Sequence, residues 1–502
     1  MRASAPLSMK IKAQTGKVGL FGIGLAAYWP QFKGLKERLE GYQRIVKIRL
    51  EKSCAVIDAG LADTAPKAAA AGELFAHEAV ELVVCYVATY ATSSQVLPAV
   101  QKVHAPVLIL NLQPRSALEY EKTDTAEWLA NCCACCVPEI ACAFARSRID
   151  FHVVTGVLGL ERGKFGEAPP GHPDSMRAWQ EIQDWARAAS VVSRLKRSRI
   201  GFLGQTYPGM LDLYSDFTQH TALLGTHLEV LEMCDLAKRL PGERESAVAA
   251  KRQETEAIFE ISQDSPADPL AKAPTAREMT WACRVAVALD RLVADFDLHG
   301  LAYYYRGLDG NQYERLGAGL ILGCSLLTAR GIPASGEGDL KNCQSMKIMD
   351  LLGCGGSYTE FYAMDFDGDF LLMGHDGPFH LGIAEGKPVL RGLGLYHGKR
   401  GFGVSVEARV KLGPVTLLAM TQTADGNLKL LAAEGESVPG PTLRIGNTNS
   451  RIKFACGLAG FVNRWCSEGP THHCALGVGR MLPAIRNIAS LLKLSCAEVG
   501  VR

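Results

Sequence analysis

Apolar residues in the first two-thirds of the chain gather in short, β-rich runs that alternate with stretches of helical period. This alternation predicts α/β units, because parallel strands covered on both faces are continuous apolar runs joined by helices. The expected strands are residues 17–24, 81–88, 105–112 and 150–158. The helices expected between them are residues 31–44, 93–103 and 124–146. Together they predict one doubly wound, Rossmann-like domain.

A glycine- and proline-rich break at residues 163–175 ends this pattern, and a second α/β pattern follows it. Its expected strands are residues 198–207, 227–236 and 298–307, and its expected helices are residues 243–263, 275–297 and 313–330. We therefore predict an N-terminal α/β domain at residues 1–172 and a central α/β domain at residues 173–348.

From about residue 353 the chain consists of closely spaced alternating runs separated by glycine turns. Two of the turns, Asp367-Gly368-Asp369 and Asp425-Gly426-Asn427, are typical of β-hairpins. The pattern predicts a mostly antiparallel C-terminal domain at residues 349–502 that contains a β-barrel. A helix over residues 480–494 is expected to close it.

Charge and hydropathy narrow the classes of partner. The 502 residues carry a net charge of +2 without a long basic or acidic block, which argues against nucleic acid and anionic membranes and favours a neutral or small-molecule substrate. The apolar stretch of residues 18–29 is too short to span a bilayer and follows no signal-peptide pattern. We expect a cytoplasmic protein, while the basic, acid-free first 16 residues leave organelle targeting as an alternative.

Sixteen cysteines predict reduced thiols in a chain expected to remain in a reducing compartment. Five of them form a cluster with two overlapping CxxC spacings: Cys132, Cys133, Cys135, Cys136 and Cys142. Structural zinc is one interpretation, but no second CxxC or histidine cluster follows at the usual distance. A buried helix lined by cysteines is the favoured one.

The candidate chemistry is a set of hard-metal ligands in the last third of the chain. Glu337, Glu360, His375 and the pair His472-His473 lie among glycines or small polar residues. Two carboxylates and two imidazoles suit an octahedral ion of the Mn²⁺ type with open positions for substrate. Since adjacent histidines project differently, one of the pair is expected to bind the ion and the other to contact substrate or to pack.

Five segments resemble the L-arabinose isomerase family, within the wider L-fucose/L-arabinose isomerase group. They are KVGLFGIGLAAYWPQFKGLKERLEGY, GIPASGEGDLKN, GGSYTEFYAMDF, LLMGHDGPFH and GPTHHCALG, in that order from about residue 17 to the C-terminal helix. The resemblance implies two α/β domains, a barrel-containing third domain and a homo-oligomer, either a trimer or a hexamer. It also implies that a neighbouring subunit completes the pocket.

The same resemblance implies a site. Glu337, Glu360, His375 and His473 match the family's four ligands to a divalent ion, usually Mn²⁺, and His472 is the accompanying histidine. The implied reaction is aldose–ketose isomerisation, with L-arabinose to L-ribulose as the reference case. Glu337 and Glu360 are expected to move the proton between C1 and C2 through a cis-enediol, with the order of their action left open.

The chain departs from the family in its sugar-contacting loops. A Gln-His-containing loop near the N-terminus reads GLAAYWPQF here, so Tyr28, Trp29 and Gln31 are expected to replace its contacts. The family histidine near the cysteine cluster is also absent. These changes leave a second hypothesis, a sugar-binding or regulatory paralogue that keeps the fold and metal without turnover. Metal-assisted hydrolysis ranks third.

Overall fold

The computed structural model describes residues 16–161, 165–263, 271–306, 310–393, 403–441, 443 and 445–500. These residues divide between Ser193 and Arg194 into two compact units, called here the N-terminal unit and the C-terminal unit. The targeting alternative at residues 1–15, residues 163–164 of the predicted break and residue 307 of a predicted strand lie outside the described residues.

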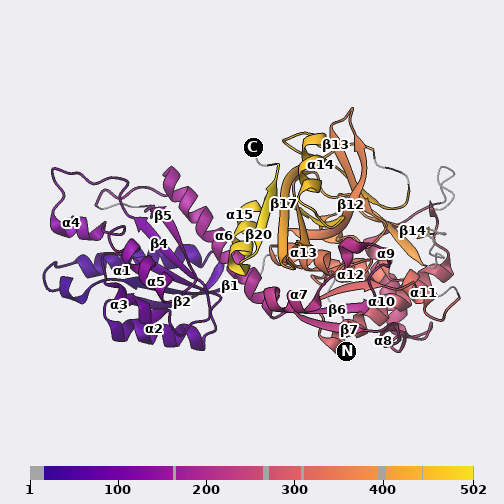
Figure 1. Ribbon diagram of the computed structural model, residues 1–502, viewed down its shortest axis with the longest axis horizontal. Helices are drawn as coiled ribbons and strands as arrows, with labels where there is room; N and C mark the ends of the chain where they lie inside the picture. The colour runs from indigo at the N-terminus through magenta and orange to yellow at the C-terminus, as the bar shows by residue number, and fades with distance from the viewer. Residues whose placement is uncertain are drawn as a thin grey trace. The chain divides into compact units, whose positions relative to one another are not determined.

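The N-terminal unit is built on a five-stranded parallel sheet with the order β2-β1-β3-β4-β5 (Figure 1). Its strands are β1 (Gly16–Ile23), β2 (Cys54–Ala62), β3 (Leu82–Val87), β4 (Val107–Gln113) and β5 (Phe151–Val157). Its helices are α1 (Leu35–Leu50), α2 (Ala65–His77), α3 (Ser93–Val96), α4 (Thr125–Ala130), α5 (Val137–Arg146) and most of α6 (Pro173–Lys196).

Helix coverage explains why the central strand β3 of this sheet is buried throughout. Every residue of β3 is buried, and Phe75 of α2 and Phe144 of α5 pack into the core that covers one of the sheet's faces. Helix α2 begins where the side chain of Thr64 accepts a hydrogen bond from Lys67 N, with Pro66 in the first turn. The N-terminal cap of α2 and the burial of β3 are therefore both consistent with a parallel sheet covered by helices.

The first part of the C-terminal unit is a second parallel sheet, with the order β11-β10-β6-β7. Its strands are β6 (Arg199–Gly204), β7 (His227–Leu231), β10 (Gly300–Tyr304) and β11 (Ala334–Ser335). Its helices are α7 (Phe217–Leu224), α8 (Met233–Ala237), α9 (Ser246–Ile258), α10 (Ala276–Phe296), α11 (Glu314–Ala318), α12 (Ile321–Ala329) and α13 (Leu340–Leu351).

A large mixed sheet forms the rest of this unit, with the order β16-β19-β12-β13-β18-β17-β20. Its strands are β12 (Gly355–Asp365), β13 (Phe370–His375), β16 (Gly413–Gln422), β17 (Leu428–Val438), β18 (Thr448–Lys453), β19 (His473–Val478) and β20 (Ser495–Val499). Strand β16 also pairs with β17, so the pairings of six antiparallel strands run in a ring.

A smaller sheet has the order β15-β14-β8, and β9 also pairs with β14. These strands are β8 (Glu260–Ile261), β9 (Ala271–Lys272), β14 (Val389–Leu393) and β15 (Val404–Glu407). The remaining helices are α14 (Leu458–Ser467) and α15 (Leu482–Leu492).

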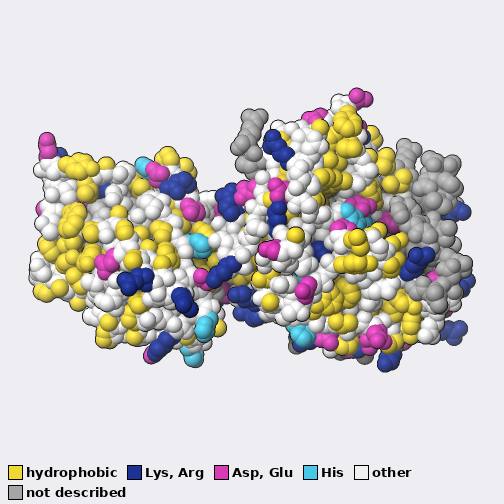
Figure 2. Space-filling model, viewed as in Figure 1, with side chains coloured by type: hydrophobic (Ala, Val, Ile, Leu, Met, Phe, Trp, Pro, Cys, Tyr) yellow, Lys and Arg dark blue, Asp and Glu magenta, His cyan; other side chains and the backbone are white. Residues whose placement is uncertain are grey.

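Figure 2 shows basic and acidic side chains interspersed over the visible face.

Helix α13 connects the two larger sheets of the C-terminal unit. It packs against β12, β16 and β19 on one side and against β10 and β11 on the other. Of its 12 residues, all except Asp350 are buried, including Lys341 and Gln344, so it lacks a polar solvent face. Its N-terminus, capped by Asp339, lies where the candidate ligands meet.

These observations confirm a mixed α/β fold with two parallel sheets and a β-rich C-terminal region. Both predicted hairpins are confirmed, since β12 pairs with β13 and β16 pairs with β17 across the two glycine turns. The three-domain boundaries and the barrel stay predictions. No helix within the described ranges combines the length and apolar character that crossing a membrane requires.

Several predicted helices are wrong in extent. Residues 124–146 form two helices, because the chain turns between Asn131 and Cys136 and Pro138 opens α5. Residues 313–330 likewise divide into α11 and α12 at Gly319 and Leu320. The final helix ends at Leu492, and β20 follows it, so the helix is not the last described element.

Candidate metal centre

The loop between β11 and α13 carries Glu337 in an unusual backbone conformation. Its φ of 59° lies in the left-handed region, which costs a non-glycine residue about 1 kcal/mol or more and is concentrated at functional sites. The next residue, Gly338, also has positive φ, and a Cβ there would lie 2.4 Å from Gln205 O. The glycine after Glu337 thus allows the loop to approach the parallel sheet closely.

Strand register brings Glu360 to two of the candidate histidines. Glu360 lies opposite His473 of β19 on one side and opposite Gly374, the neighbour of His375, on the other. Directly opposed residues share a face of the sheet, so Glu360 and His473 project together. Glu360 Oε1 lies 4.0 Å from His375 Nε2.

His473 is fully buried and held at both ring nitrogens. Nδ1 lies 3.0 Å from the Asp339 carboxylate, and Nε2 lies 2.7 Å from the phenol oxygen of Tyr358. A carboxylate that accepts from Nδ1–H leaves the lone pair on Nε2, which is the arrangement of many metal-binding histidines. Burial lowers the pKa of His473 despite the opposing effect of Asp339, so the ring is neutral and suited to bind a cation.

His375 has a similar arrangement at the end of β13. Its Nδ1 lies 3.0 Å from the Asp376 carboxylate and accepts from Gly377 N at 3.0 Å in the alternative tautomer. Donation to Asp376 frees Nε2 for an ion. Its ring lies 4.1 Å from the Tyr358 ring, measured between centroids.

His472 is more exposed than His473 and faces another carboxylate. Its backbone N and ring Nδ1 both donate to Asp212 Oδ2, at 2.9 and 2.7 Å. Burial opposes protonation of the ring, but hydrogen bonding to Asp212 and Glu337 outweighs it and raises the pKa of His472 to about 10. Burial raises the pKa of Asp212, but hydrogen bonds from the side chain and backbone of His472, together with its charge, hold this pKa down to about 2.

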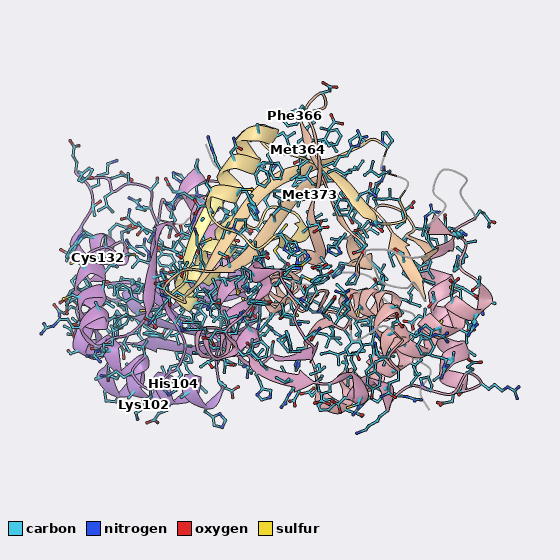
Figure 3. The ribbon with its side chains drawn as sticks, turned by 45° about the vertical axis from the view of Figure 1, so that its right-hand side comes forward. Lys102, His104, Cys132, Met364, Phe366 and Met373 are labelled. Atoms are coloured by element: carbon cyan, nitrogen blue, oxygen red, sulfur yellow. The ribbon has the colours of Figure 1, made fainter. Side chains whose placement is uncertain are left out.

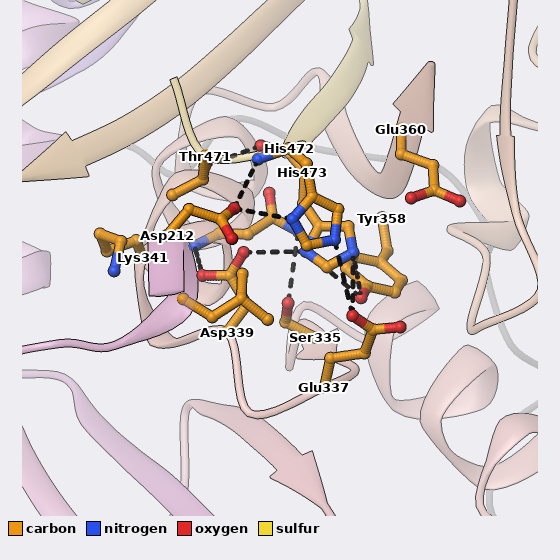
Figure 4. A network of polar contacts seen from close by, with 12 residues as sticks. Asp212, Ser335, Glu337, Asp339, Lys341, Tyr358, Glu360, Thr471, His472 and His473 are labelled. Atoms are coloured by element: carbon orange, nitrogen blue, oxygen red, sulfur yellow. Dashed lines mark hydrogen bonds and ion pairs between the residues drawn. The ribbon is translucent and has the colours of Figure 1, made fainter. Parts of the chain in front are cut away.

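The candidate ligands form two trios that share one histidine. Glu337, His472 and His473 make the first trio, and Glu360, His375 and His473 make the second, with ligand atoms within 4.8 Å of one another in each. Figure 4 shows His473 between these groups, with Glu360 set apart from the connected network. The predicted ligands Glu337, Glu360, His375 and His473 are thus divided between the trios.

The donor set fits a divalent cation. Two atoms bound to one ion at about 2.2 Å lie at most about 4.4 Å apart. Glu337 Oε2 lies 3.5 Å from His472 Nε2 and 3.7 Å from His473 Nε2, which is within that limit. This Oε2 is buried beside the rings of His472 and His473.

The charges around the site are mostly negative. Asp339 is fully buried. Burial raises the pKa of Glu337, but the neighbouring histidines outweigh this effect and lower the pKa below its usual value. The buried ammonium of Lys341 offers a counter-charge, donating to Tyr214 O and Ser215 Oγ at 2.9 Å each. Burial lowers the pKa of Lys341, against the effect of Asp339 and Asp212. A divalent ion would offset the remaining negative charge.

The three predicted sugar contacts lie in the N-terminal unit. Trp29 donates to Asp63 Oδ2 at 2.9 Å, and Gln31 donates to Ala27 O at 2.7 Å. The ring of Tyr28 contacts that of Phe32 edge-on. Their role in binding sugar stays a prediction.

Sequence reasoning missed two carboxylates and one phenol. Asp339 is two residues after Glu337, and its position before a helix is a signal for a cap, but nothing local indicates its contact with His473. Tyr358 is two residues before Glu360 on the same strand and therefore shares its face. Asp212 is 260 residues from His472, and no sequence pattern connects them.

The cysteine cluster contributes to neither trio. Both groups of side chains that could hold a metal ion among the described residues consist of glutamates and histidines. Cys132, Cys133 and Cys136 are buried, whereas Cys135 and Cys142 are exposed. The cysteines begin in a turn between α4 and α5, so the prediction of one continuous cysteine-lined helix is wrong.

Comparison with known proteins gives no family. No protein-family model matches the chain, and no curated protein matches its sequence.

Proposed function

We propose that this protein is a metal-dependent aldose–ketose isomerase of the L-arabinose isomerase type, acting on L-arabinose or a related aldose. The observation that carries the proposal is the pair of trios joined at His473. The carboxylates of Glu337 and Glu360 and the imidazoles of His375 and His473 are ligand types that Mn²⁺ accepts. The five sequence segments that resemble the family contain all of these residues.

The finer architecture belongs to the same proposal. The ring of strand pairings among β12, β13, β16, β17, β18 and β19 supports a barrel in the C-terminal domain. We further propose a cytoplasmic homo-oligomer, a trimer or hexamer, in which the N-terminal domain of one subunit completes the pocket of another. Tyr28, Trp29 and Gln31 would then contact the sugar.

Glu337, Glu360, His375 and His473 would hold the ion, with His472 beside them. A bound Mn²⁺ supplies Lewis-acid stabilisation of the negative charge that develops on neighbouring sugar oxygens. The Asp339 carboxylate keeps Nε2 of His473 unprotonated, and Asp376 is placed to do the same for His375. Both histidines are buried, which limits water around the reacting carbons.

Proton transfer falls to the two glutamates. One carboxylate takes the proton from C2 of the aldose, exchanges it with solvent and delivers a proton to C1, while the other assists proton movement between the two oxygens, so the sugar passes through a cis-enediol. Hydrogen bonding and charge from the neighbouring histidines keep Glu337 ionised despite its burial. The order in which Glu337 and Glu360 act is open.

The test is ketose formation from a panel of aldopentoses and aldohexoses by the manganese-loaded protein. We expect L-arabinose or a stereochemically related sugar to be converted, chelation to abolish conversion, and Mn²⁺ to restore it. A folded, metal-loaded protein that converts none of the sugars would overturn the proposal. Thermal stabilisation by a sugar without conversion would instead favour the sugar-binding paralogue.

A further inference from the structure

The turn between α4 and α5 holds two cysteine pairs of CxxC spacing, Cys132 with Cys135 and Cys133 with Cys136. Neither pair takes part in the proposed isomerisation, and the residues of both trios belong to the C-terminal unit rather than to the N-terminal unit that carries this turn. The structure distinguishes the two pairs by burial and by hydrogen bonding.

The pair Cys133 and Cys136 belongs to the core. Their exposed fractions are 1% and 0%, and both pack in the apolar cluster on one face of the parallel sheet. The thiol of Cys133 donates to Leu112 O at 3.6 Å, and that of Cys136 donates to Thr89 O at 3.9 Å. Burial raises the pKa of both thiols. Buried thiols of this kind are unreactive.

The pair Cys132 and Cys135 differs in both respects. Cys135 is exposed, whereas Cys132, labelled in Figure 3, is 5% exposed. Burial raises the pKa of the Cys132 thiol to about 12, and charge and hydrogen bonding from the neighbouring Cys135 thiol add to this rise. One accessible sulfur therefore lies beside a protected one.

The pair lies in the turn that leads into helix α5. Both cysteines precede α5, a helix of 10 residues with Cys136 as its N-cap residue and Pro138 in its first turn. A CxxC turn that leads into a helix is the arrangement of reversible dithiols. A sulfur at Cys135 can be attacked by the sulfur already next to it.

We propose that Cys132 and Cys135 form a reversible disulfide site that reacts with peroxides. The Cys135 thiolate attacks one peroxide oxygen, the O–O bond breaks, and a sulfenic acid and hydroxide form. The Cys132 sulfur then attacks the Cys135 sulfur, the S–S bond forms, and the sulfenic hydroxyl leaves with the Cys132 proton as water, while the proton released from the Cys135 thiol neutralises the hydroxide. Two thiols lose two electrons, and hydrogen peroxide is reduced to two waters.

The experiment uses the full-length, reduced protein and one equivalent of hydrogen peroxide. Remaining thiols are alkylated after denaturation, and the tryptic peptide of residues 123–146, which contains all five cysteines, is weighed. We expect two fewer alkylated thiols, the loss of two hydrogen masses, and full reversal by dithiothreitol. Fragmentation is expected to assign the bond to Cys132 and Cys135.

Variants separate this pair from its neighbours. Cys132→Ser and Cys135→Ser should each abolish the bond, and Cys132→Ala serves if the serine variant fails to fold. Cys142→Ser is the matched control, an exposed cysteine on the same peptide whose loss should leave the bond intact. A bond that persists in Cys132→Ala, a link to Cys133 or Cys136, or over-oxidised Cys135 without a bond would overturn the proposal. None of these outcomes depends on the isomerase activity.

Discussion

The phenol oxygen of Tyr358 lies 2.7 Å from Nε2 of His473, the ring nitrogen that also faces Glu337. Both side chains are fully buried. Because Asp339 accepts from Nδ1–H, the phenol donates to the lone pair that an ion would use. The hydroxyl of Tyr358 therefore competes with a cation for His473.

Tyr358→Phe should bind Mn²⁺ more tightly than the unmodified protein. Loss of a competing hydrogen bond of about 1 kcal/mol corresponds to an affinity gain of roughly fivefold. Isothermal titration of chelator-treated protein measures it. Tyr362→Phe is the matched control, since that phenol lies on the same strand and accepts from Asn447. Weaker binding by Tyr358→Phe would show that the phenol supports the ion.

Asp339→Asn should lower Mn²⁺ affinity by about 10- to 100-fold with little loss of stability, because the carboxylate that fixes the His473 ring is lost. Asparagine still caps α13, whereas Asp339→Ala should cost about a further 1 kcal/mol of unfolding free energy. Metal titration and urea unfolding separate the effects. Asp216→Asn, at the cap of α7, is the control that should leave metal affinity unchanged.

Glu360→Gln should lower kcat by about 10²- to 10⁴-fold, the usual contribution of a general acid or base, while the protein stays folded. Steady-state ketose formation measures the loss, and circular dichroism checks the fold. Glu256→Gln, in an exposed ion pair with Arg252, should retain full activity. Activity within threefold of the unmodified protein would remove Glu360 from the proton path.

The buried imidazole of His220 should make the metal-free protein acid-sensitive. Burial lowers its pKa to about 3, and both ring nitrogens lack a hydrogen-bond partner among the described residues. The unfolded chain takes up a proton as the pH falls through about 6.5, whereas the native state resists protonation until about pH 3. The free energy of unfolding should therefore fall through this window.

Urea unfolding at several pH values tests the His220 prediction. His220→Leu should flatten the pH dependence between pH 6.5 and 3, whereas the exposed His104→Leu should leave it as it is. Equal slopes in His220→Leu and the unmodified protein would contradict the assignment.

Sequence patterning predicted the parts of the fold that short-range signals specify. Wholly apolar strands such as β3 and the Asp425-Gly426-Asn427 hairpin were located correctly, since burial on both faces and turn chemistry are local. Strand β2 was missed, because it lies at the edge of the sheet and its exposed and buried residues follow no continuous apolar run. The break between α4 and α5 was also missed, although Pro138 marks it.

The sequence indicated which residues form the candidate site. The topology of the strands and helices brings these residues together. The position of His375 at the end of β13 follows from the apolar run before it. The register that sets Glu360 opposite His473 joins strands more than 100 residues apart and has no local signal. The same is true of Asp339, which reaches His473 only because α13 packs between two sheets.

The most direct test of the account is the product formed from L-arabinose, or the preferred aldose of the panel, in D₂O by the manganese-loaded protein. Proton transfer through a cis-enediol predicts a ketose that carries solvent deuterium at C1, detected by NMR. We expect formation of this ketose to be lost in the His473→Asn variant. Formation of no ketose from any aldose, or of a ketose that retains all of the substrate's hydrogen, would contradict it.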